Sequence, residues 1–244
     1  MSVVVRSCLF AAVQILITPP FAIVALLTFP LPPFTRYRVI TTWSRLIVAA
    51  AEKICGVRYR VIGAENLPQQ PAVILAKHQS AWETLAFPIL FPPQAMVVKR
   101  ELLWIPFFGW GLAMLSPIAI DRSAGTRAAR QMIEQGKERL AQGFWILVFP
   151  EGTRVAPGAR GKYRVGGSAI AAQTGAPIVP VAHNAGCCWG RAAFLKHPGM
   201  VTVSIGPALD SRGARAEALT QQAENWIESE MQRLGRADGR AGLC

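Results

Sequence analysis

The chain has 244 residues, of which 52% are hydrophobic and only 16% are charged, and its formal net charge is +12 at pH 7. This length suits one α/β domain with or without a membrane appendage, and it can bury a core without the disulfides or metals that small domains need. Such a composition is more apolar than that of an ordinary soluble domain. The positive charge suits anionic lipid headgroups, nucleic acid or phosphorylated substrates, and does not choose among them.

The N-terminal region carries no charged residue between positions 7 and 35. A run of this length can cross a bilayer, which needs about 20 apolar residues. Pro19 and Pro20 lie in its middle, where we expect them to kink or split a helix. A second helical segment follows over 41–56. We therefore expect residues 1–55 to form a membrane-associated two-helix element, either spanning or lying in one leaflet, with a buried helix pair as the alternative.

From residue 56 onward, short β-branched runs alternate with helical stretches. The predicted strands are 57–62, 71–76, 95–99, 117–120, 144–149, 177–182 and 200–206, and the predicted helices are 83–90, 123–142, 167–173 and an amphipathic segment around 219–234. Continuous apolar strands between helices predict an α/β fold with a mixed, mostly parallel sheet covered by helices. We expect this domain to cover residues 56–235, followed by a frayed tail over 236–244.

Several kinds of chemistry lack their sequence signatures. The run "GGSAI" lacks the last glycine of a serine nucleophile elbow, and neither a Walker loop nor a dinucleotide-binding glycine fingerprint occurs. The three histidines and the Cys187–Cys188 pair have no recognised ligand spacing, so no metal site is predicted. No basic stretch interleaved with aromatic residues occurs, which disfavours nucleic acid as a partner.

His78 and Glu83 form the first candidate site, at a predicted strand-to-helix turn in "KHQSAWE". A neutral imidazole can take a proton from an alcohol, while a carboxylate on its other nitrogen fixes the tautomer. The bland alternative is a hydrogen-bonded histidine beside a helix-capping acid. This spacing alone does not decide between the two.

Three further stretches follow or contain predicted strands. Arg122 ends "SPIAIDR", the run Glu151, Gly152, Thr153 and Arg154 ends "VFPEGTR", and Pro180 lies within "APIVPVA". Two arginines at the carboxyl ends of strands can clamp a phosphate monoester. Their alternatives are surface ion pairs for the arginines and an edge strand for the proline.

As an ordered set, "KHQSAWE", "IDR", "FPEGTR" and "IVPV" resemble the four motifs of the 1-acyl-sn-glycerol-3-phosphate acyltransferases (lysophosphatidate acyltransferases). The resemblance covers roughly residues 56 to 207. Two positions depart from the usual Asn-His-x4-Asp pattern: Lys77 precedes the histidine, and Glu83 replaces the aspartate.

The resemblance implies acyl transfer from acyl carrier protein or coenzyme A to the sn-2 hydroxyl of lysophosphatidate, giving phosphatidic acid, with no cofactor and no metal. It implies that His78 is the general base and Glu83 its orienting acid. It further implies that Arg122 and the run Glu151, Gly152, Thr153 and Arg154 bind the acceptor, and that Pro180 holds a structural or acyl-donor position. Membrane phospholipid is the expected partner, at the cytoplasmic face of the cell inner membrane.

Two questions stay open at this level. The run 102–110, "LLWIPFFGW", is too short to span a bilayer; it can line an acyl-chain groove, dip into the interface or pack in the core. The acceptor can also be another lysolipid, such as a lyso-ornithine lipid, and a non-catalytic lipid-binding protein is the alternative of a different class. The His78–Glu83 pair argues against a mere binder.

Overall fold

The computed structural model describes residues 1–121 and 124–237. Within these residues seven strands form one sheet in the order β1-β7-β6-β2-β5-β3-β4. The strands are β1 (Val57–Ile62), β2 (Val73–Ala76), β3 (Gln94–Lys99), β4 (Ile118–Ile120), β5 (Trp145–Val148), β6 (Ile178–His183) and β7 (Gly199–Ile205). Neighbouring strands from β6 to β4 are parallel, whereas β7 is antiparallel to β6. The predicted mixed, mostly parallel sheet is confirmed.

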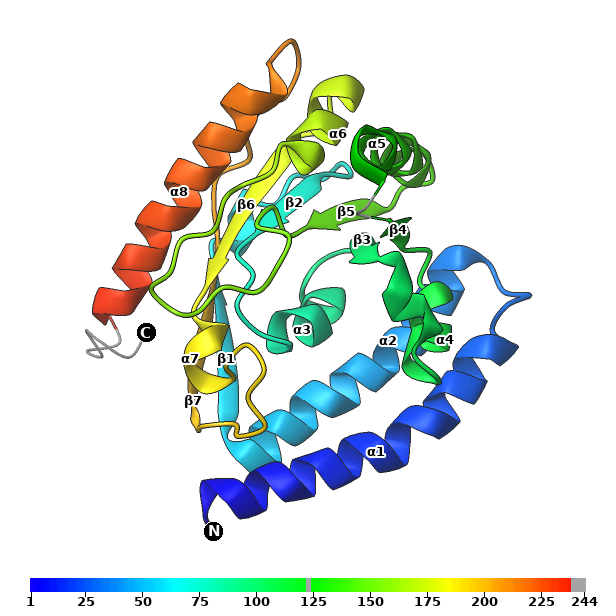
Figure 1. Cartoon of the computed structure of the whole chain (residues 1–244), viewed down its shortest axis with the longest axis vertical. Coiled ribbons are helices and arrows are strands. Elements are labelled where there is room, and N and C mark those ends of the chain that lie inside the picture. Colours follow the sequence, from blue (N-terminus) through cyan, green and yellow to red (C-terminus); the bar gives the residue numbers. More distant parts are fainter. Residues whose placement is uncertain (122–123, 238–244) are drawn as a thin grey trace.

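Helices cover both faces of the sheet (Figure 1). One face packs against α5 (Gly125–Ala141), α6 (Gly166–Thr174) and α8 (Ala216–Ala237), and the other packs against α3 (Trp82–Leu90). Alternate side chains of β2 explain the two layers: Val73 and Leu75 belong to the first core, and Ile74 belongs to the second. A fully buried strand of this kind reads as a continuous apolar run, which is why it could be predicted.

The N-terminal element consists of α1 (Val3–Leu27) and α2 (Pro33–Ala50), which continues into one π-helical turn over Ala51–Cys55. The two helices pack side by side, with α2 lying between α1 and α3 (Figure 1). Gly56 ends this segment in the left-handed conformation, with φ of 73°. A glycine adopts that conformation without steric cost, so the chain can turn directly into β1.

Helix α1 does not split at Pro19 and Pro20, so that part of the prediction is wrong. Each proline leaves the carbonyl four residues earlier without its helical donor. Those carbonyls belong to Ile15 and Leu16, which are 74% and 76% exposed, so the break in hydrogen bonding lies on the outer side of the helix. Helix α1 is long and apolar enough to cross a membrane, and only 17% of its most apolar window is buried.

The topology brings the ends of the parallel strands to one edge of the sheet. Residues 77–78 follow β2, residues 149–154 follow β5, and β6 ends beside them at His183. Ligand sites in α/β sheets lie at such edges. This edge holds most of the residues that the sequence singled out.

Candidate active site

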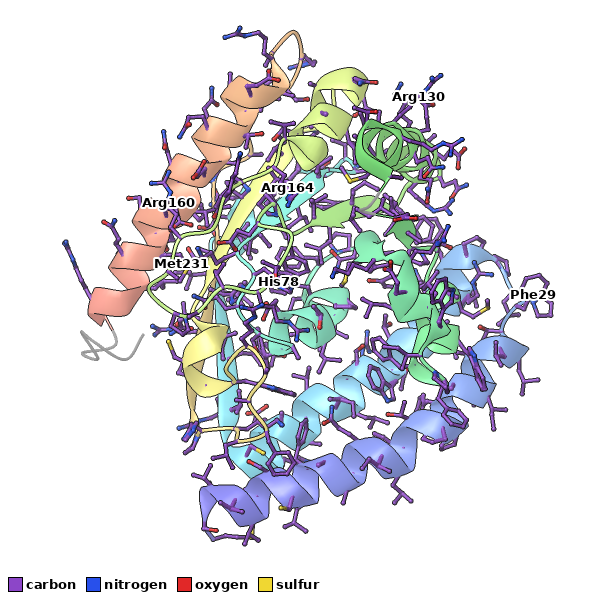
Figure 2. The ribbon with its side chains drawn as sticks, in the orientation of Figure 1. Phe29, His78, Arg130, Arg160, Arg164 and Met231 are labelled. Atoms are coloured by element: carbon purple, nitrogen blue, oxygen red, sulfur yellow. The ribbon has the colours of Figure 1, made fainter. Side chains whose placement is uncertain are left out.

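His78 lies at the end of β2, and its backbone is fixed from two sides. Its N–H donates to Glu151 Oε2 at 3.0 Å, and its carbonyl accepts the Val155 N–H at 2.8 Å. One residue earlier, the Lys77 N–H donates to the Val181 carbonyl of β6. The histidine backbone is therefore held between the sheet and the loop that follows β5. Figure 2 shows His78 in the middle of the molecule, near this loop and α3.

The side chains of His78 and Glu83 are in contact, with Nδ1 and Oε1 2.9 Å apart. The same carboxylate oxygen accepts the backbone N–H groups of Gln79 and Ser80, at 2.9 and 2.7 Å. Glu83 stands in the first turn of α3 and is fully buried. One carboxylate oxygen thus contacts both the turn backbone and the imidazole, and the length of glutamate suffices for both contacts.

The charge state of Glu83 follows from its surroundings. Burial alone opposes ionisation, but the charge of His183 when protonated and the hydrogen bonds from His78 and Ser80 outweigh it and hold the pKa of Glu83 below its ordinary value. We attribute the net effect chiefly to the hydrogen bonds, because burial lowers the pKa of His183 and keeps that ring neutral. An ionised Glu83 accepts a hydrogen bond from the N–H at Nδ1 of His78, and in the neutral ring Nε2 then carries the lone pair.

Phe149, the residue after β5, stacks on the His78 ring with centroids 4.1 Å apart and an interplanar angle of 17°. The His78 side chain is 14% exposed. The ring is therefore held in one plane by Phe149 and at one nitrogen by Glu83. A base that stays partly accessible while it is fixed in orientation suits proton transfer.

Lys77 occupies a buried charge network beneath the histidine. Its ammonium donates to Glu151 Oε1 at 2.8 Å, to Glu228 Oε1 of α8 at 2.8 Å and to the Ala159 carbonyl at 3.0 Å. Lys77 and the Glu151 side chain are 1% and 0% exposed. Both oxygens of Glu151 thus accept hydrogen bonds from groups of the protein itself, and Glu151 connects Lys77 to the His78 backbone.

The rest of the predicted acceptor segment lies nearer the surface. Gly152 has φ of 69°, which permits the turn after β5, and Thr153 is exposed. Arg154 is half-buried and donates from Nη1 to the Arg191 carbonyl at 3.3 Å. Arg122 lies outside the described residues. Of the two predicted clamp arginines, Arg154 is therefore the one that the structure places at this edge.

Pro180 is buried inside β6, between β7 and β2. The edge-strand alternative is therefore wrong. A central proline is tolerated because the β6–β7 ladder is interrupted there: residues 181–183 pair with 203–205, whereas Ile178 pairs with Leu209. The Pro180 carbonyl accepts the Gly206 N–H at 2.9 Å within that interruption. The position has a clear structural role in the sheet.

A cavity of about 210 Å³ opens between the N-terminal helices and the sheet. Most of its wall is apolar, with contributions from Phe21 of α1, Trp43 of α2, Pro88 of α3 and Met96 of β3. Thr84, the residue after Glu83, and Arg154 also line it, so the cavity reaches the segments that hold the candidate site.

The run 102–110 contributes to this cavity and to the surface. It forms a 3-10 turn over Arg100–Trp104 and enters α4 (Phe108–Ala113), which packs on α1. Leu102 and Phe108 line the cavity, whereas Trp104 is 66% exposed. Of the three alternatives, core packing is therefore wrong for the exposed part of this run.

No group of three or more histidine, cysteine or acidic side chains that could hold a metal occurs in residues 1–121 and 124–237. His183, the second histidine near the site, is fully buried, with its Nε2 2.8 Å from the Lys77 carbonyl. Its Nδ1 accepts the Ala185 N–H, so Nε2 carries the proton.

Sequence comparison assigns this fold and site to an acyltransferase. The sequence profile of the family described as Acyltransferase matches residues 58–184, and the chain belongs to this family. It is 49% identical over 207 residues to the 1-acyl-sn-glycerol-3-phosphate acyltransferase of Pseudomonas aeruginosa, an alignment that covers 83% of this chain and 80% of that protein.

Two more distant proteins are also similar, one in sequence and one in fold. The human 1-acyl-sn-glycerol-3-phosphate acyltransferase alpha is 34% identical over 139 residues, covering 56% of this chain and 49% of that one. The crystal structure of the 1-acyl-sn-glycerophosphate acyltransferase PlsC from Thermotoga maritima is similar in fold, with a TM-score of 0.77 at 22% identity, over 95% of this chain and 94% of that one.

Three residues of the site were missed by sequence reasoning: Phe149, His183 and Glu228. Phe149 directly precedes "PEGTR" as the last residue of the predicted strand 144–149, so its place at a strand end was the available signal. Glu228 stands 151 positions after Lys77, on a helix that reads as an ordinary amphipathic segment. No local pattern reports a contact over that separation.

Proposed function

We propose that this enzyme transfers an acyl chain from a thioester to the sn-2 hydroxyl of 1-acyl-sn-glycerol 3-phosphate and so forms phosphatidic acid. The observation that carries the proposal is the contact between His78 Nδ1 and the buried Glu83 Oε1, in a chain 49% identical to a protein named for this activity. That contact provides a positioned base, which a passive lipid binder does not need.

His78 acts as the general base in this proposal. Its Nε2 takes the proton of the sn-2 hydroxyl as the oxygen attacks the thioester carbonyl, and Glu83 stabilises the imidazolium that forms. The tetrahedral intermediate then collapses with cleavage of the carbon–sulfur bond. The imidazolium returns its proton to the departing thiolate, so the free thiol leaves. Direct attack of this kind involves no acyl-enzyme and no bound cofactor, since the thioester is a co-substrate.

Arg154 is the proposed contact for the acceptor phosphate, together with Arg122 on the strength of its motif. Arg154 is half-buried at the site edge, and its bond to the Arg191 carbonyl engages one of five N–H donors. A planar guanidinium can hold two phosphate oxygens at once. The formal net charge of +12 also favours an anionic acceptor at an anionic membrane.

The apolar cavity is the proposed place for an acyl chain. It lies between α1, α2, α3 and β3 and reaches Thr84, next to Glu83. Its apolar wall gives methylene groups a water-free environment worth about 0.8 kcal/mol each. The thioester itself is carried by coenzyme A or acyl carrier protein.

Membrane association through α1 completes the proposal. The helix is 25 residues long, its most apolar window is little buried, and Phe29 at the following turn is 70% exposed and points away from the molecule (Figure 2). Exposed Trp104 on the neighbouring segment adds an aromatic side chain of the kind found at membrane interfaces. We place the enzyme at the cytoplasmic face of the cell inner membrane.

An acceptor panel tests the proposed function. Purified enzyme in detergent receives one labelled acyl thioester and, in separate reactions, 1-acyl-sn-glycerol 3-phosphate, lysophosphatidylcholine, lysophosphatidylethanolamine and a lyso-ornithine lipid. We expect turnover with the phosphate monoester to exceed the others by at least about 10²-fold. Preferred turnover of the lyso-ornithine lipid would contradict the proposal and favour that alternative. Parallel reactions with coenzyme A and carrier-protein thioesters identify the donor.

A further inference from the structure

A chain of buried polar contacts runs from the C-terminal helix to the catalytic histidine. Glu228 of α8 accepts from Lys77 Nζ at 2.8 Å, and Lys77 Nζ donates to Glu151 Oε1 at 2.8 Å. The other Glu151 oxygen accepts the His78 N–H at 3.0 Å. Helix α8 lies beyond residues 58–184, the part of the chain that the family profile matches.

Each member of this chain is held by further contacts. Lys77 Nζ makes a third bond, to the Ala159 carbonyl, so its three donors are all used. The Gly161 N–H donates to Glu151 Oε1 at 3.2 Å, and the Tyr163 hydroxyl donates to Glu228 Oε1 at 2.8 Å. Burial and the charges of Glu151 and Glu228 raise the pKa of Tyr163, so its hydroxyl remains a donor.

The balance of charge explains why both carboxylates need Lys77. Two acidic side chains, exposed by 0% at Glu151 and 17% at Glu228, share one ammonium that is 1% exposed. Removing one partner of a buried ion pair leaves an uncompensated charge, which is strongly unfavourable. Without Lys77 the two carboxylates would repel each other, and the loop that carries Glu151 would move away from His78.

We propose that Lys77 and Glu228 are positioning residues, which hold Glu151 against the His78 backbone and thereby make α8 part of the active-site support. The inference rests on the proposed function, because it concerns the placement of the base. It also accounts for the lysine before the histidine: the ammonium reaches both the loop after β5 and α8. The network positions the His78 backbone at the edge of the sheet, whereas Glu83 fixes the orientation of the His78 ring.

Glu224 provides a matched control one helical turn before Glu228. Glu224 lies on the same helix and accepts hydrogen bonds from the Arg160 guanidinium at 2.7 and 2.9 Å. It makes no hydrogen bond to Lys77. Glu224→Gln and Glu228→Gln therefore remove the same charge from neighbouring positions of α8, but only Glu228 bonds directly to Lys77. Lys77→Met and the double variant Lys77→Met/Glu228→Gln complete the set.

The experiment measures kcat and KM together with hydrogen–deuterium exchange of the segment 77–83. We expect Glu228→Gln to lower kcat by about 10- to 100-fold with both KM values within about twofold, and to speed exchange at the His78 amide. Glu224→Gln leaves kcat and exchange as in the wild type. In Lys77→Met we expect kcat to fall by at least about 10²-fold. The double variant recovers part of that loss in kcat, because one of the two carboxylates has been neutralised.

The outcomes separate this inference from the proposed function. If Glu228→Gln matches Glu224→Gln in kcat and in exchange, or changes only the thermal midpoint, the positioning role is wrong. If Lys77→Met does not fold, the comparison of Glu228→Gln with Glu224→Gln in kcat and in exchange still tests the positioning role. Wild-type turnover of lysophosphatidate reports on the proposed function by itself, and the exchange measurement does not depend on it.

Discussion

Glu83 Oε1 lies 2.9 Å from His78 Nδ1 and accepts, with the same oxygen, the backbone N–H groups of Gln79 and Ser80. One carboxylate oxygen thus closes the strand-to-helix turn and holds Nδ1 of the His78 ring. The fold of the turn and the chemistry of the histidine cannot be changed independently at this residue.

The role of His78 is tested by His78→Ala. Loss of a general base is expected to lower kcat by about 10²- to 10⁴-fold. The backbone bonds of residue 78 to Glu151 and Val155 do not use its side chain, so the fold persists. Circular dichroism and the thermal midpoint serve as controls. Near wild-type turnover from a folded variant would contradict the role of His78 as general base.

Glu83 offers a graded test with Glu83→Gln and Glu83→Asp. Glutamine keeps the volume but loses the charge that stabilises the imidazolium, so we expect kcat to fall by about 10²- to 10⁴-fold. Aspartate is one methylene shorter and retains much of the activity if the turn adjusts. The ratio of kcat between the two variants is the measurement. Equal kcat of Glu83→Gln and the wild type would mean that Glu83 only caps the helix.

Removal of the Arg154 guanidinium should weaken use of the acceptor. A charge-assisted contact contributes about 1.5 to 3 kcal/mol, so Arg154→Ala is expected to raise the acceptor KM by about ten- to a hundredfold and to leave the donor KM unchanged. Arg154→Lys should recover only part of this loss. The same result is expected for Arg122→Ala.

Arg130→Ala is the matched control for the arginine test. Arg130 is exposed on α5, well away from His78 (Figure 2). An acceptor without a phosphate monoester should not respond to either clamp variant. Unchanged acceptor kinetics in both Arg154→Ala and Arg122→Ala would remove the phosphate clamp from the mechanism.

His183 predicts a pH dependence of stability. Burial lowers the pKa of this histidine in the folded state. As pH falls below about 6.5, the ordinary pKa of histidine, the unfolded chain gains a proton that the folded chain does not, so the free energy of unfolding decreases until the folded pKa is reached. The decrease is at most about 1.4 kcal/mol per pH unit.

The comparison of wild type with His183→Gln isolates this contribution. The variant lacks the titrating ring, so its stability deficit is expected to be largest near pH 7.5 and to narrow towards pH 5. Denaturant unfolding in one detergent at several pH values measures the difference. A deficit that is constant over this range would mean that His183 takes up its proton equally in both states.

Membrane attachment is tested by a chain that begins at Gly56. It should lose most membrane association, because α1 carries most of the exposed apolar side chains outside the α/β domain. Alkaline carbonate extraction and protease access to an N-terminal tag separate a spanning from an interfacial helix. Full-length protein that remains soluble without detergent would contradict the attachment.

Local pattern predicted much of the fold and the centre of the site. The strand before His78 is buried on both faces, so its apolar run identified it, and Glu83 lies within one helical turn. Long-range contacts could not be predicted in this way. Nothing near Glu228 in sequence indicates Lys77, and nothing near Pro180 indicates the interrupted ladder opposite Gly206.

The predicted split at Pro19 and Pro20 was wrong for a related reason. A proline inside a helix is unfavourable where the freed carbonyl is buried without a partner, and sequence alone does not say which side of the helix that is. Here Ile15 and Leu16 lie on the outer side. Helix α1 therefore continues through both prolines.

Helix α1 also forms one wall of the apolar cavity, since Phe21, Ala22 and Ala25 line it from inside while Ile23 and Val24 face outward. A single layer of helix thus separates the interior from whatever surrounds the protein on that side. In a bilayer, an acyl chain would exchange surrounding tails for the cavity wall by sliding sideways past one helix, with few methylenes wetted on the way. Deleting α1 would open the cavity to water, so an anchor-free version of this enzyme would need a replacement wall rather than a shorter chain.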